Sequence, residues 1–356
     1  MHATEELREL ADLGIPIVSS THARGVLPDS HPRSLGAFHN SAAVETLLAS
    51  ADLALVVGSR LRSNETKTYS IQFPEELIQV DAAPAAQQRN YAVRHFICAE
   101  ARETLAALVQ DLAGHSFTSA AYDEEIRQAR TDAVAQLTEQ LGPYAEICFA
   151  LREALPKDGI LVRDITMSGS TWGSRLFPVE APLRNIHSLA GAIGLGLAHA
   201  IGSAKANPDK KVVALVGDGG LMLGIGEIAT MVQEQSNLVL LVMNDGGYGV
   251  MRGIQNKYFD DRQYFNQLHT PSYKDLGTSM GCQSYLATSV AEFKDVIQQA
   301  IAYIGPSVVE VDMNSIGPLN FAGPRRRSCI NKGPARHRKT SLRTAANILL
   351  WTITMA

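Results

Sequence analysis

Two aspartates, each placed directly after an apolar run, are the strongest candidates for chemistry in the sequence. The first run ends in Gly-Asp-Gly-Gly at 217–220, and the second ends in Asn-Asp-Gly-Gly at 244–247. A helical pattern over 225–235 separates the two runs. Parallel strands joined by one helix usually lie side by side, and their carboxyl ends form the edge where α/β sheets bind ligands. We therefore expect Asp218 and Asp245 to converge on one point.

The residue types at this point are suited to a divalent cation and a phosphate group. Carboxylate and carbonyl oxygens bind Mg²⁺ or Ca²⁺ rather than zinc, and Mg²⁺ usually takes phosphate oxygens as further ligands. Glycines let backbone N–H groups approach an anion beside a helix N-terminus. A single Gly-Asp-Gly is common in turns, and an aspartate after a strand often only caps the next helix. The pairing of the two motifs favours a Mg²⁺–diphosphate site.

Short apolar runs alternate with helical patterns over most of the chain. The pattern predicts strands at 15–19, 53–57, 76–80, 96–99, 160–162, 211–216, 238–243 and 307–311. It predicts helices at 42–51, 103–112, 123–141, 144–155, 190–206, 225–235 and 290–303. Such alternation is typical of parallel sheets with helices on both faces, so we expect an α/β fold with two doubly wound parallel-sheet domains.

Composition along the chain divides it into four regions. Residues 1–115 and 143–323 carry the two alternating patterns, and residues 116–142 form a helical linker between them. Residues 324–356 are basic, with an apolar end at 345–356. Because neither part of this tail continues the α/β pattern, we expect a disordered or non-native extension rather than an interaction tail. Its deletion should then leave the melting temperature nearly unchanged.

The composition excludes several classes of protein. The 356 residues are 46% hydrophobic and 19% charged, which is ordinary for a globular protein with a buried core. The four cysteines are far apart and lack metal-binding spacing, which argues against a disulfide scaffold or a zinc finger. No apolar run spans a membrane and no signal peptide is evident, so we expect a cytoplasmic protein. The basic tail leaves an acidic body, so nucleic acid is not an expected partner.

The paired motifs resemble the thiamine diphosphate motif, which begins with Gly-Asp-Gly and closes with Asn-Asn. Other segments are similar to the superfamily of acetolactate synthase, benzoylformate decarboxylase and pyruvate decarboxylase. RGVLPDSHPRSLG (24–36), ADLALVVGSRL (51–61) and LIQVDAAP (77–84) resemble its central domain. AGAIGLGLAHAIGSA (190–204) and VVEVDMNSIGP (308–318) resemble its diphosphate-binding domain.

The resemblance implies a set of metal and diphosphate contacts. The Mg²⁺ ligands would be the carboxylates of Asp218 and Asp245 and the backbone carbonyl of Gly247. Asp245 stands where the family has its second asparagine, and its extra charge would oppose the diphosphate. Asn244 is expected to order the turn rather than to bind metal. The other cofactor contacts implied on this side are Gly217, Gly219, Gly220, Tyr248, Thr166 and Met167.

The resemblance also implies how the ring half of thiamine diphosphate would be held. The carbonyl of Gly191 would accept a hydrogen bond from the aminopyrimidine, and Ile193 would bend the cofactor so that its amino group reaches the thiazolium. Without the resemblance, Ile193 would be interpreted as an ordinary core residue. The segment 256–270 would cover the site as a lid. The polar stretch 62–69 carries no specific signal for FAD, which acetolactate synthases bind in their central domain.

The implied activity is a thiamine diphosphate- and Mg²⁺-dependent decarboxylation or carboligation of a 2-oxo acid substrate. The family has three domains, and the first supplies a glutamate that protonates the cofactor; the sequence begins inside the second. We therefore expect no catalytic residue of this kind in the chain, and either a separate pyrimidine-domain subunit, a homodimer or a truncated gene product. The alternative is a non-catalytic cofactor-binding remnant or regulatory subunit without turnover.

Two further interpretations are less favoured. A NAD-type Rossmann protein is not expected, because no Gly-x-Gly-x-x-Gly follows the first strand. His187 lies just before the segment that would hold the aminopyrimidine, and His31 and His39 flank a loop of the central domain. We expect each of these histidines to have a structural role or to be solvated. Glu5 and Glu6 are expected at the surface, at the start of a helix.

Overall fold

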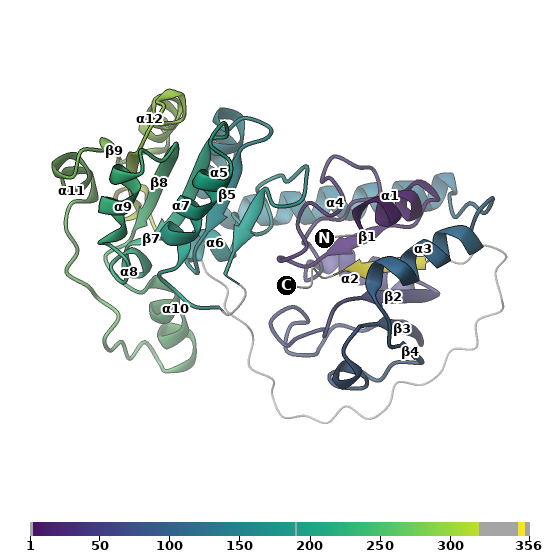
Figure 1. Cartoon of the computed structure of the whole chain (residues 1–356). Helices are drawn as coiled ribbons and strands as arrows, with labels where there is room; N and C mark the ends of the chain where they lie inside the picture. The colour runs from purple at the N-terminus through teal and green to yellow at the C-terminus, as the bar shows by residue number, and fades with distance from the viewer. Residues whose placement is uncertain (1–2, 189–190, 320–347, 353–356) are drawn as a thin grey trace. The chain divides into compact units, whose positions relative to one another are not determined.

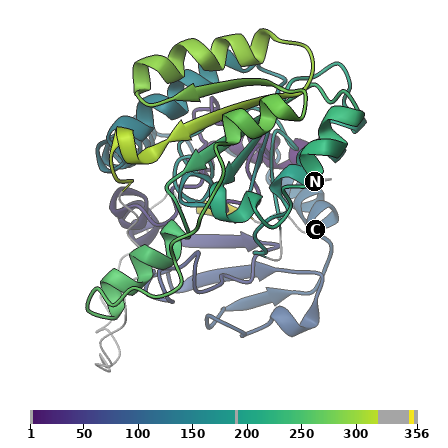
Figure 2. The same cartoon turned by 90° about the vertical axis from the view of Figure 1, so that its left-hand side faces the viewer.

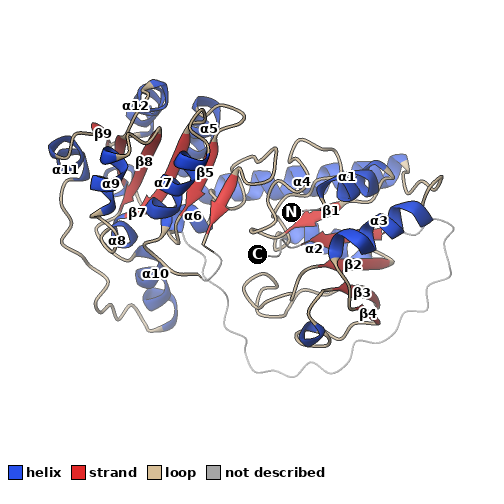
Figure 3. Cartoon of the chain, viewed as in Figure 1, coloured by secondary structure: helices blue, strands red, loops and turns tan. Residues whose placement is uncertain are grey.

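The computed structural model describes residues 3–188, 191–319 and 348–352. The chain forms two compact units: the first comprises Met1–Val134 with Pro324–Ala356, and the second comprises Ala135–Gly323 (Figure 1). Each unit contains one sheet whose paired strands are all parallel, flanked by helices (Figure 3). The prediction of an α/β fold with two parallel-sheet units is confirmed.

The sheet of the first unit has the strand order β1-β11-β2-β3-β4. Its strands are β1 (Ile17–Ser19), β2 (Leu53–Val57), β3 (Glu76–Val80), β4 (His95–Ile97) and β11 (Ile348–Thr352). Its helices are α1 (Thr4–Asp12), α2 (Ala42–Ser50) and α3 (Ala101–Asp111), with a 3₁₀ turn η1 at Pro84–Ala86. Leu10 of α1 and Leu105 of α3 are buried in one cluster with Leu55 and Leu350 of the sheet. Apolar burial between these helices and one face of the sheet therefore stabilises the unit.

The position of β11 corrects the expectation for the tail. Ile348–Thr352 is not an extension but the strand between β1 and β2, with Ile17 opposite Leu350 and Leu53 opposite Ile348. Leu349, Leu350 and Trp351 are fully buried. A central parallel strand is covered on both faces, so it reads as a continuous apolar run without alternation. The basic part of the tail lies outside the described residues.

A long helix links the two units in the sequence. Helix α4 (Ala120–Leu141) runs without a break across the boundary between Val134 and Ala135. Its first half is held to the first unit by an ion pair between Arg33 Nη2 and Asp123 Oδ1 at 2.6 Å. Tyr122 Oη donates to the carbonyl oxygen of Ile348 at 3.4 Å, so α4 also contacts β11.

The sheet of the second unit has the strand order β6-β5-β7-β8-β10-β9. Its strands are β5 (Ile160–Arg163), β6 (Asn185–His187), β7 (Val212–Gly217), β8 (Leu238–Asn244), β9 (Gln283–Ala287) and β10 (Ser307–Asp312). The longer helices are α5 (Pro143–Ala154), α7 (Gly196–Ala206), α9 (Glu227–Gln233), α10 (Gly249–Tyr258), α11 (Tyr273–Ser279) and α12 (Val290–Ala302). The short helices are α6 (Met167–Ser170), α8 (Asp218–Leu221) and α13 (Met313–Ile316).

Helices cover both faces of this second sheet. Alternate residues of β5, β7, β8 and β10 form one cluster with the apolar side chains of α7 and α9. Helix α12 packs against α5 and against β9 and β10, and Figure 2 shows it lying along these two strands. The central strands β7 and β8 are buried along nearly their whole length, as their uninterrupted apolar sequences predict. Their carboxyl ends are therefore held rigidly.

The sequence patterns missed several elements of the second unit. Strand β6, helices α10 and α11 and strand β9 fold from segments with mixed polarity that predicted loops. Helix α7 begins at Gly196 rather than at 190, because Gly191 and Gly194 have φ of +70° and +85°. These angles lie in the left-handed region and cannot continue a right-handed helix. Residues 191–195 are therefore a loop.

Within the described ranges, no helix combines the length and the apolar character that crossing a bilayer requires.

Candidate functional site

The two aspartates converge, as the motif spacing predicted. Strands β7 and β8 pair directly, with Gly217 opposite Met243 at their carboxyl ends. Asp218 begins α8 immediately after β7, and Asp245 directly follows β8. Their carboxyl groups lie close enough for the charge of Asp245 to raise the pKa of Asp218. The site therefore lies where two adjacent buried strands end.

Burial controls the protonation of this pair. Asp218 is only 1% exposed, and burial followed by the negative charge of Asp245 raises its pKa to about 7. Burial also raises the pKa of Asp245, but the positive charge of Arg252 acts in the opposite direction. Asp218 therefore keeps its proton to a higher pH than a solvent-exposed aspartate does. Asp218 Oδ2 is buried and makes no hydrogen bond.

This arrangement fits a divalent cation. A buried carboxylate oxygen without a partner is costly, and a cation that displaced the proton of Asp218 would satisfy both carboxylates. The carbonyl oxygen of Gly247 lies 3.3 Å from the position that a Cβ atom on Gly219 would take, so it borders the same turn. An oxygen-only donor set suits Mg²⁺. Among the described residues no group of three or more His, Cys, Asp or Glu side chains forms a metal site, so the cation would need carbonyl and phosphate oxygens as well.

Close contacts explain why the turn after β7 is rich in glycine. A Cβ on Gly217 would lie 2.9 Å from Thr166 Oγ1, and a Cβ on Gly219 would lie 2.7 Å from Tyr248 Cδ1. Larger residues at either position would collide with these side chains. The structure thus brings two further predicted residues, Thr166 and Tyr248, against the turn.

Two other predicted residues also border the site. The Cε atom of Met167 lies 2.6 Å from the position of a Cβ on Gly249, in the first turn of α10. A Cβ on Gly220 would lie 3.1 Å from Asp164 Oδ2, so Gly220 faces this buried carboxylate. Asp164 was not among the residues that the sequence motifs identified.

Asn244 orders the turn that carries Asp245. Its Oδ1 accepts from the backbone N–H of Gly246 at 3.1 Å, and its Nδ2 donates to Glu310 Oε1 at 2.8 Å. The other oxygen of Glu310 accepts from the backbone N–H of Lys274 at 2.9 Å. Glu310 is 5% exposed, and the sequence motifs do not identify it as a site residue. A charged residue inside the apolar run VVEVD was the available signal.

The loop 191–195 presents apolar side chains to solvent beside this turn. Ile193 is 38% exposed and Leu195 is 39% exposed. The interpretation of Ile193 as an ordinary core residue is therefore wrong, and its role as a cofactor wedge stays a prediction. Among the described residues, chain neighbours aside, no atom lies within 4 Å of a Cβ position on Gly191, whose φ of +70° favours glycine.

The predicted lid is tied to the turn that carries Asp245. Residues 256–258 belong to α10, and the segment that follows returns to the turn. Asn266 accepts at its carbonyl oxygen from Tyr248 N at 2.8 Å, and Leu268 N donates to the carbonyl oxygen of Gly246 at 3.1 Å. The Asn266 side chain is buried and donates to Gln255 Oε1 at 2.6 Å. The segment thus borders the site, and its action as a lid stays a prediction.

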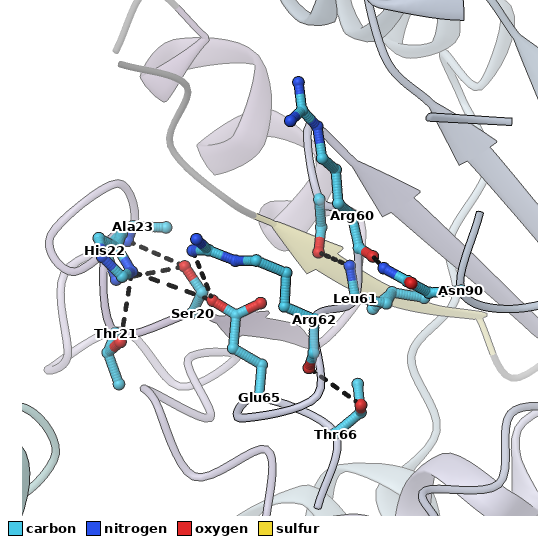
Figure 4. Close-up of polar contacts among 11 residues, drawn as sticks. Ser20, Thr21, His22, Ala23, Arg60, Leu61, Arg62, Glu65, Thr66 and Asn90 are labelled. Carbon is cyan, nitrogen blue, oxygen red and sulfur yellow. Dashed lines mark hydrogen bonds and ion pairs between the residues drawn. The ribbon is translucent and has the colours of Figure 1, made fainter. Parts of the chain in front are cut away.

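A second polar cluster occupies the loops after β1 and β2 in the first unit (Figure 4). Arg62 Nη2 donates to Glu65 Oε1 at 3.5 Å, and His22 Nδ1 lies 3.9 Å from the same oxygen. Glu65 is 2% exposed, and burial raises its pKa despite the neighbouring Arg62. Ser20 Oγ accepts from the backbone N–H of His22 at 3.2 Å. The cluster therefore connects the two loops.

The remaining candidates have structural contacts. His31 Nε2 lies 3.1 Å from Asp12 Oδ1, and His39 is buried against the ring of Trp351. His187 lies at the end of β6 opposite Arg163 of β5. Glu6 is buried rather than at the surface, and its Oε1 accepts from Arg102 Nε at 3.0 Å.

Comparison with known proteins agrees with this geometry. Residues 164–311 match the thiamine pyrophosphate enzyme C-terminal TPP-binding domain, and residues 1–108 match the central domain of the same family. An acetolactate synthase of Mycobacterium bovis is 27% identical over 317 residues, which cover 84% of this chain and 51% of that protein. The acetolactate synthase isozyme 1 large subunit of Escherichia coli is 24% identical over 323 residues, covering 88% and 57%. A probable 2-ketoarginine decarboxylase of Pseudomonas aeruginosa is 28% identical over 313 residues, covering 87% and 56%.

The parallel sheets and the glycine-rich aspartate turn define an α/β protein with a cofactor-type site. Together with the two domain matches, they place the chain in the thiamine pyrophosphate enzyme family, of which it carries the central and C-terminal domains. The chain spans about half the length of the curated relatives that it matches.

Proposed function

We propose that the chain belongs to a Mg²⁺- and thiamine diphosphate-dependent enzyme that decarboxylates a 2-oxo acid or joins it to a second carbonyl compound. The observation that carries this proposal is the pair of Asp218 and Asp245 at the ends of two adjacent buried strands, with one buried oxygen of Asp218 left without a partner. The names of the relatives include both an acetolactate synthase and a probable decarboxylase.

Different residues of this chain would bind the metal ion, the diphosphate and the ring half of the cofactor. The carboxylates of Asp218 and Asp245 and the carbonyl of Gly247 would hold Mg²⁺, and the backbone N–H groups of the turn 217–220 would bind the diphosphate. The carbonyl of Gly191 would accept from the ring half of the cofactor. When bound, the thiazolium ring supplies the electron sink for the loss of CO₂.

We further propose that a second polypeptide supplies the proton-transferring glutamate. Among the described residues, the acidic side chains at the site each have another role: Asp218 and Asp245 face the cation position, while Asp164 and Glu310 accept backbone N–H groups. A separate pyrimidine-domain subunit would complete the site; we also propose a homodimer, whose second copy would not supply this glutamate. We propose a cytoplasmic location for this assembly.

Titration calorimetry tests the cofactor assignment. The full chain should bind thiamine diphosphate in the presence of Mg²⁺, and Asp218→Ala should abolish the Mg²⁺-dependent part of this binding. Asp209→Ala, at an exposed position before β7, serves as the matched control and should bind normally. Unchanged affinity in Asp218→Ala would reject the proposed metal site.

The alternative is a protein that binds the cofactor but has no activity. It rests on the observation that the chain matches only about half of the length of its relatives. Measurement of turnover separates the two proposals. The chain alone should not decarboxylate pyruvate or benzoylformate, whereas addition of a pyrimidine-domain subunit should produce CO₂. Cofactor binding without CO₂ release under both conditions would favour the binding protein. CO₂ release by the chain alone would show that a proton relay exists within it.

A further inference from the structure

The buried carboxylate of Asp164 connects the end of β5 to the loop 191–195. Asp164 directly follows β5 and is 2% exposed. Its Oδ1 accepts from the backbone N–H of Ile165 at 2.7 Å. Its Oδ2 accepts from the N–H of Gly194 at 2.8 Å and from the N–H of Gly196 at 3.4 Å. One side chain therefore fixes both the end of the loop and the start of α7.

The same carboxylate touches the turn after β7. A Cβ on Gly220 would lie 3.1 Å from Asp164 Oδ2, and a Cβ on Gly196 would lie 2.8 Å from the Cβ of Asp164. On its other side, Gly194 lies so close to the turn that a Cβ would come within 2.8 Å of Leu223 Cβ and 3.2 Å of the Gly220 carbonyl oxygen. Asp164 thus sets the separation between the loop and the turn.

The two segments that Asp164 joins offer different chemistry to a ligand. The turn carries carboxylates and glycine N–H groups, which suit a cation and an anion. The loop carries the partly exposed side chains Ile193 and Leu195, and Leu223 beside it is 61% exposed. A ligand with a charged group at one end and a ring at the other would use both segments at once. Its affinity would then depend on how accurately the two segments are spaced.

We propose that Asp164 is a positioning residue that fixes the loop 191–195 against the turn 217–220, and so sets the affinity for the ring half of thiamine diphosphate but not for its diphosphate. This inference rests on the proposed function. Carboxylate acceptors make stronger hydrogen bonds to N–H groups than neutral acceptors do. In Asp164→Asn, the amide either presents a neutral oxygen or turns its NH₂ group toward the N–H groups of Gly194 and Gly196. Either arrangement loosens the loop.

Two ligands distinguish positioning from general stability. Full chains of the wild type and Asp164→Asn are titrated with thiamine diphosphate and, separately, with inorganic pyrophosphate, each with Mg²⁺. We expect Asp164→Asn to lose about tenfold or more in affinity for thiamine diphosphate and to keep its affinity for pyrophosphate. Asp158→Asn, exposed before the other end of β5, should match the wild type for both ligands. Equal losses for both ligands, or no loss for either, would overturn the proposal.

A second variant approaches the same contact from the loop. Gly194→Ala keeps Asp164 but forces the loop away from Leu223, and φ of +85° adds strain. It should show the same selective loss, and the double variant should lose little more than either single variant, because both changes act on one link. Additive losses would contradict the shared link. If Asp164→Asn fails to fold, the ligand titrations of Gly194→Ala still test the proposal.

Amide hydrogen exchange provides a readout that needs no cofactor. The N–H groups of Gly194 and Gly196 should exchange faster in Asp164→Asn, while those of β7 and β8 keep their wild-type rates. If the wild-type chain binds neither ligand, the proposed function fails, and these exchange rates alone decide whether Asp164 fixes the loop. Unchanged exchange at both glycines would reject the positioning role.

Discussion

Arg252 contacts Asp245 through two different atoms of that residue. Its Nη2 donates to the backbone carbonyl oxygen of Asp245 at 3.2 Å, and its Nη1 lies 3.8 Å from the Oδ2 atom of the carboxylate. The extra negative charge that Asp245 brings to the turn is therefore opposed by a neighbouring positive charge. The sequence alone predicted only that the charge of Asp245 would oppose a diphosphate. It did not predict the compensating charge of Arg252, which lies seven residues further along, on α10.

Removal of this positive charge should weaken binding of the Mg²⁺–diphosphate unit. We expect Arg252→Gln to lose about threefold to fivefold in affinity for thiamine diphosphate, since a partly exposed ion pair is screened by solvent. Asp245→Asn in the same background should restore part of the loss, because the net charge returns to its original value. Arg262→Gln, at an exposed position, is the control. Calorimetry of the four proteins measures the effect, and failure of Asp245→Asn to restore binding would contradict the charge argument.

The response to Mg²⁺ should depend on pH through Asp218. Its pKa is raised to about 7 from an ordinary value of 3.8, so between these values the folded protein holds a proton that the unfolded chain releases. The stability of the metal-free protein should therefore fall as pH rises from about 4 to 7. The proposed metal site requires ionised Asp218, so Mg²⁺ should raise the melting temperature more at pH 8 than at pH 6.

Asp218→Asn provides the control for this pH dependence. The variant has no carboxyl group to titrate at this position, so it should show neither the fall in stability nor the pH-dependent Mg²⁺ effect. Thermal melts at several pH values, with and without Mg²⁺, compare the two proteins. An equal rise in melting temperature with Mg²⁺ at pH 6 and pH 8 in the wild type would contradict the assignment.

The position of the site could be predicted from the sequence because strand ends determine it. Asp218 and Asp245 each follow an uninterrupted apolar run, and such runs form adjacent buried strands whose carboxyl ends meet. The supporting residues could not be found in the same way. Asp164 and Glu310 act through backbone N–H groups of segments 30 and 36 residues away in sequence, respectively. Such contacts depend on tertiary packing, which local patterns do not record.

Glu310 should matter for both stability and metal binding. It accepts from Asn244 Nδ2 and from Lys274 N, so Glu310→Gln would turn an amide NH₂ group toward at least one buried donor. An unsatisfied buried group costs about 1–3 kcal/mol. We expect chemical denaturation to show a loss of this size and Mg²⁺-dependent cofactor binding to weaken, because Asn244 orders the turn of Asp245. Glu227→Gln, at an exposed position, should leave both stability and cofactor binding unchanged. Unaltered stability in Glu310→Gln would show that the hydrogen bond between Asn244 and Glu310 does not hold the turn.

The last strand of the chain shows a different limit of sequence patterns. The apolar end 345–356 does not continue the α/β pattern of the sequence, so the sequence predicts a tail there rather than a strand. The strand order β1-β11-β2 shows that β1 and β2 do not pair with each other, so the sheet is continuous only when β11 lies between them. These residues are apolar, but nothing in the local sequence indicates that they pair with strands at 17–19 and 53–57.

Trp351 should therefore be essential to the first unit. Its side chain is fully buried, with its ring 5.2 Å from that of His39 and 5.5 Å from that of Phe73. Trp351→Ala removes this packing from a central strand and should cost about 3–5 kcal/mol in the free energy of unfolding. Ile97→Ala, on the edge strand β4 where the side chain is 41% exposed, should cost much less. Chemical denaturation of both variants measures the difference, and similar small losses would show that β11 does not complete the sheet.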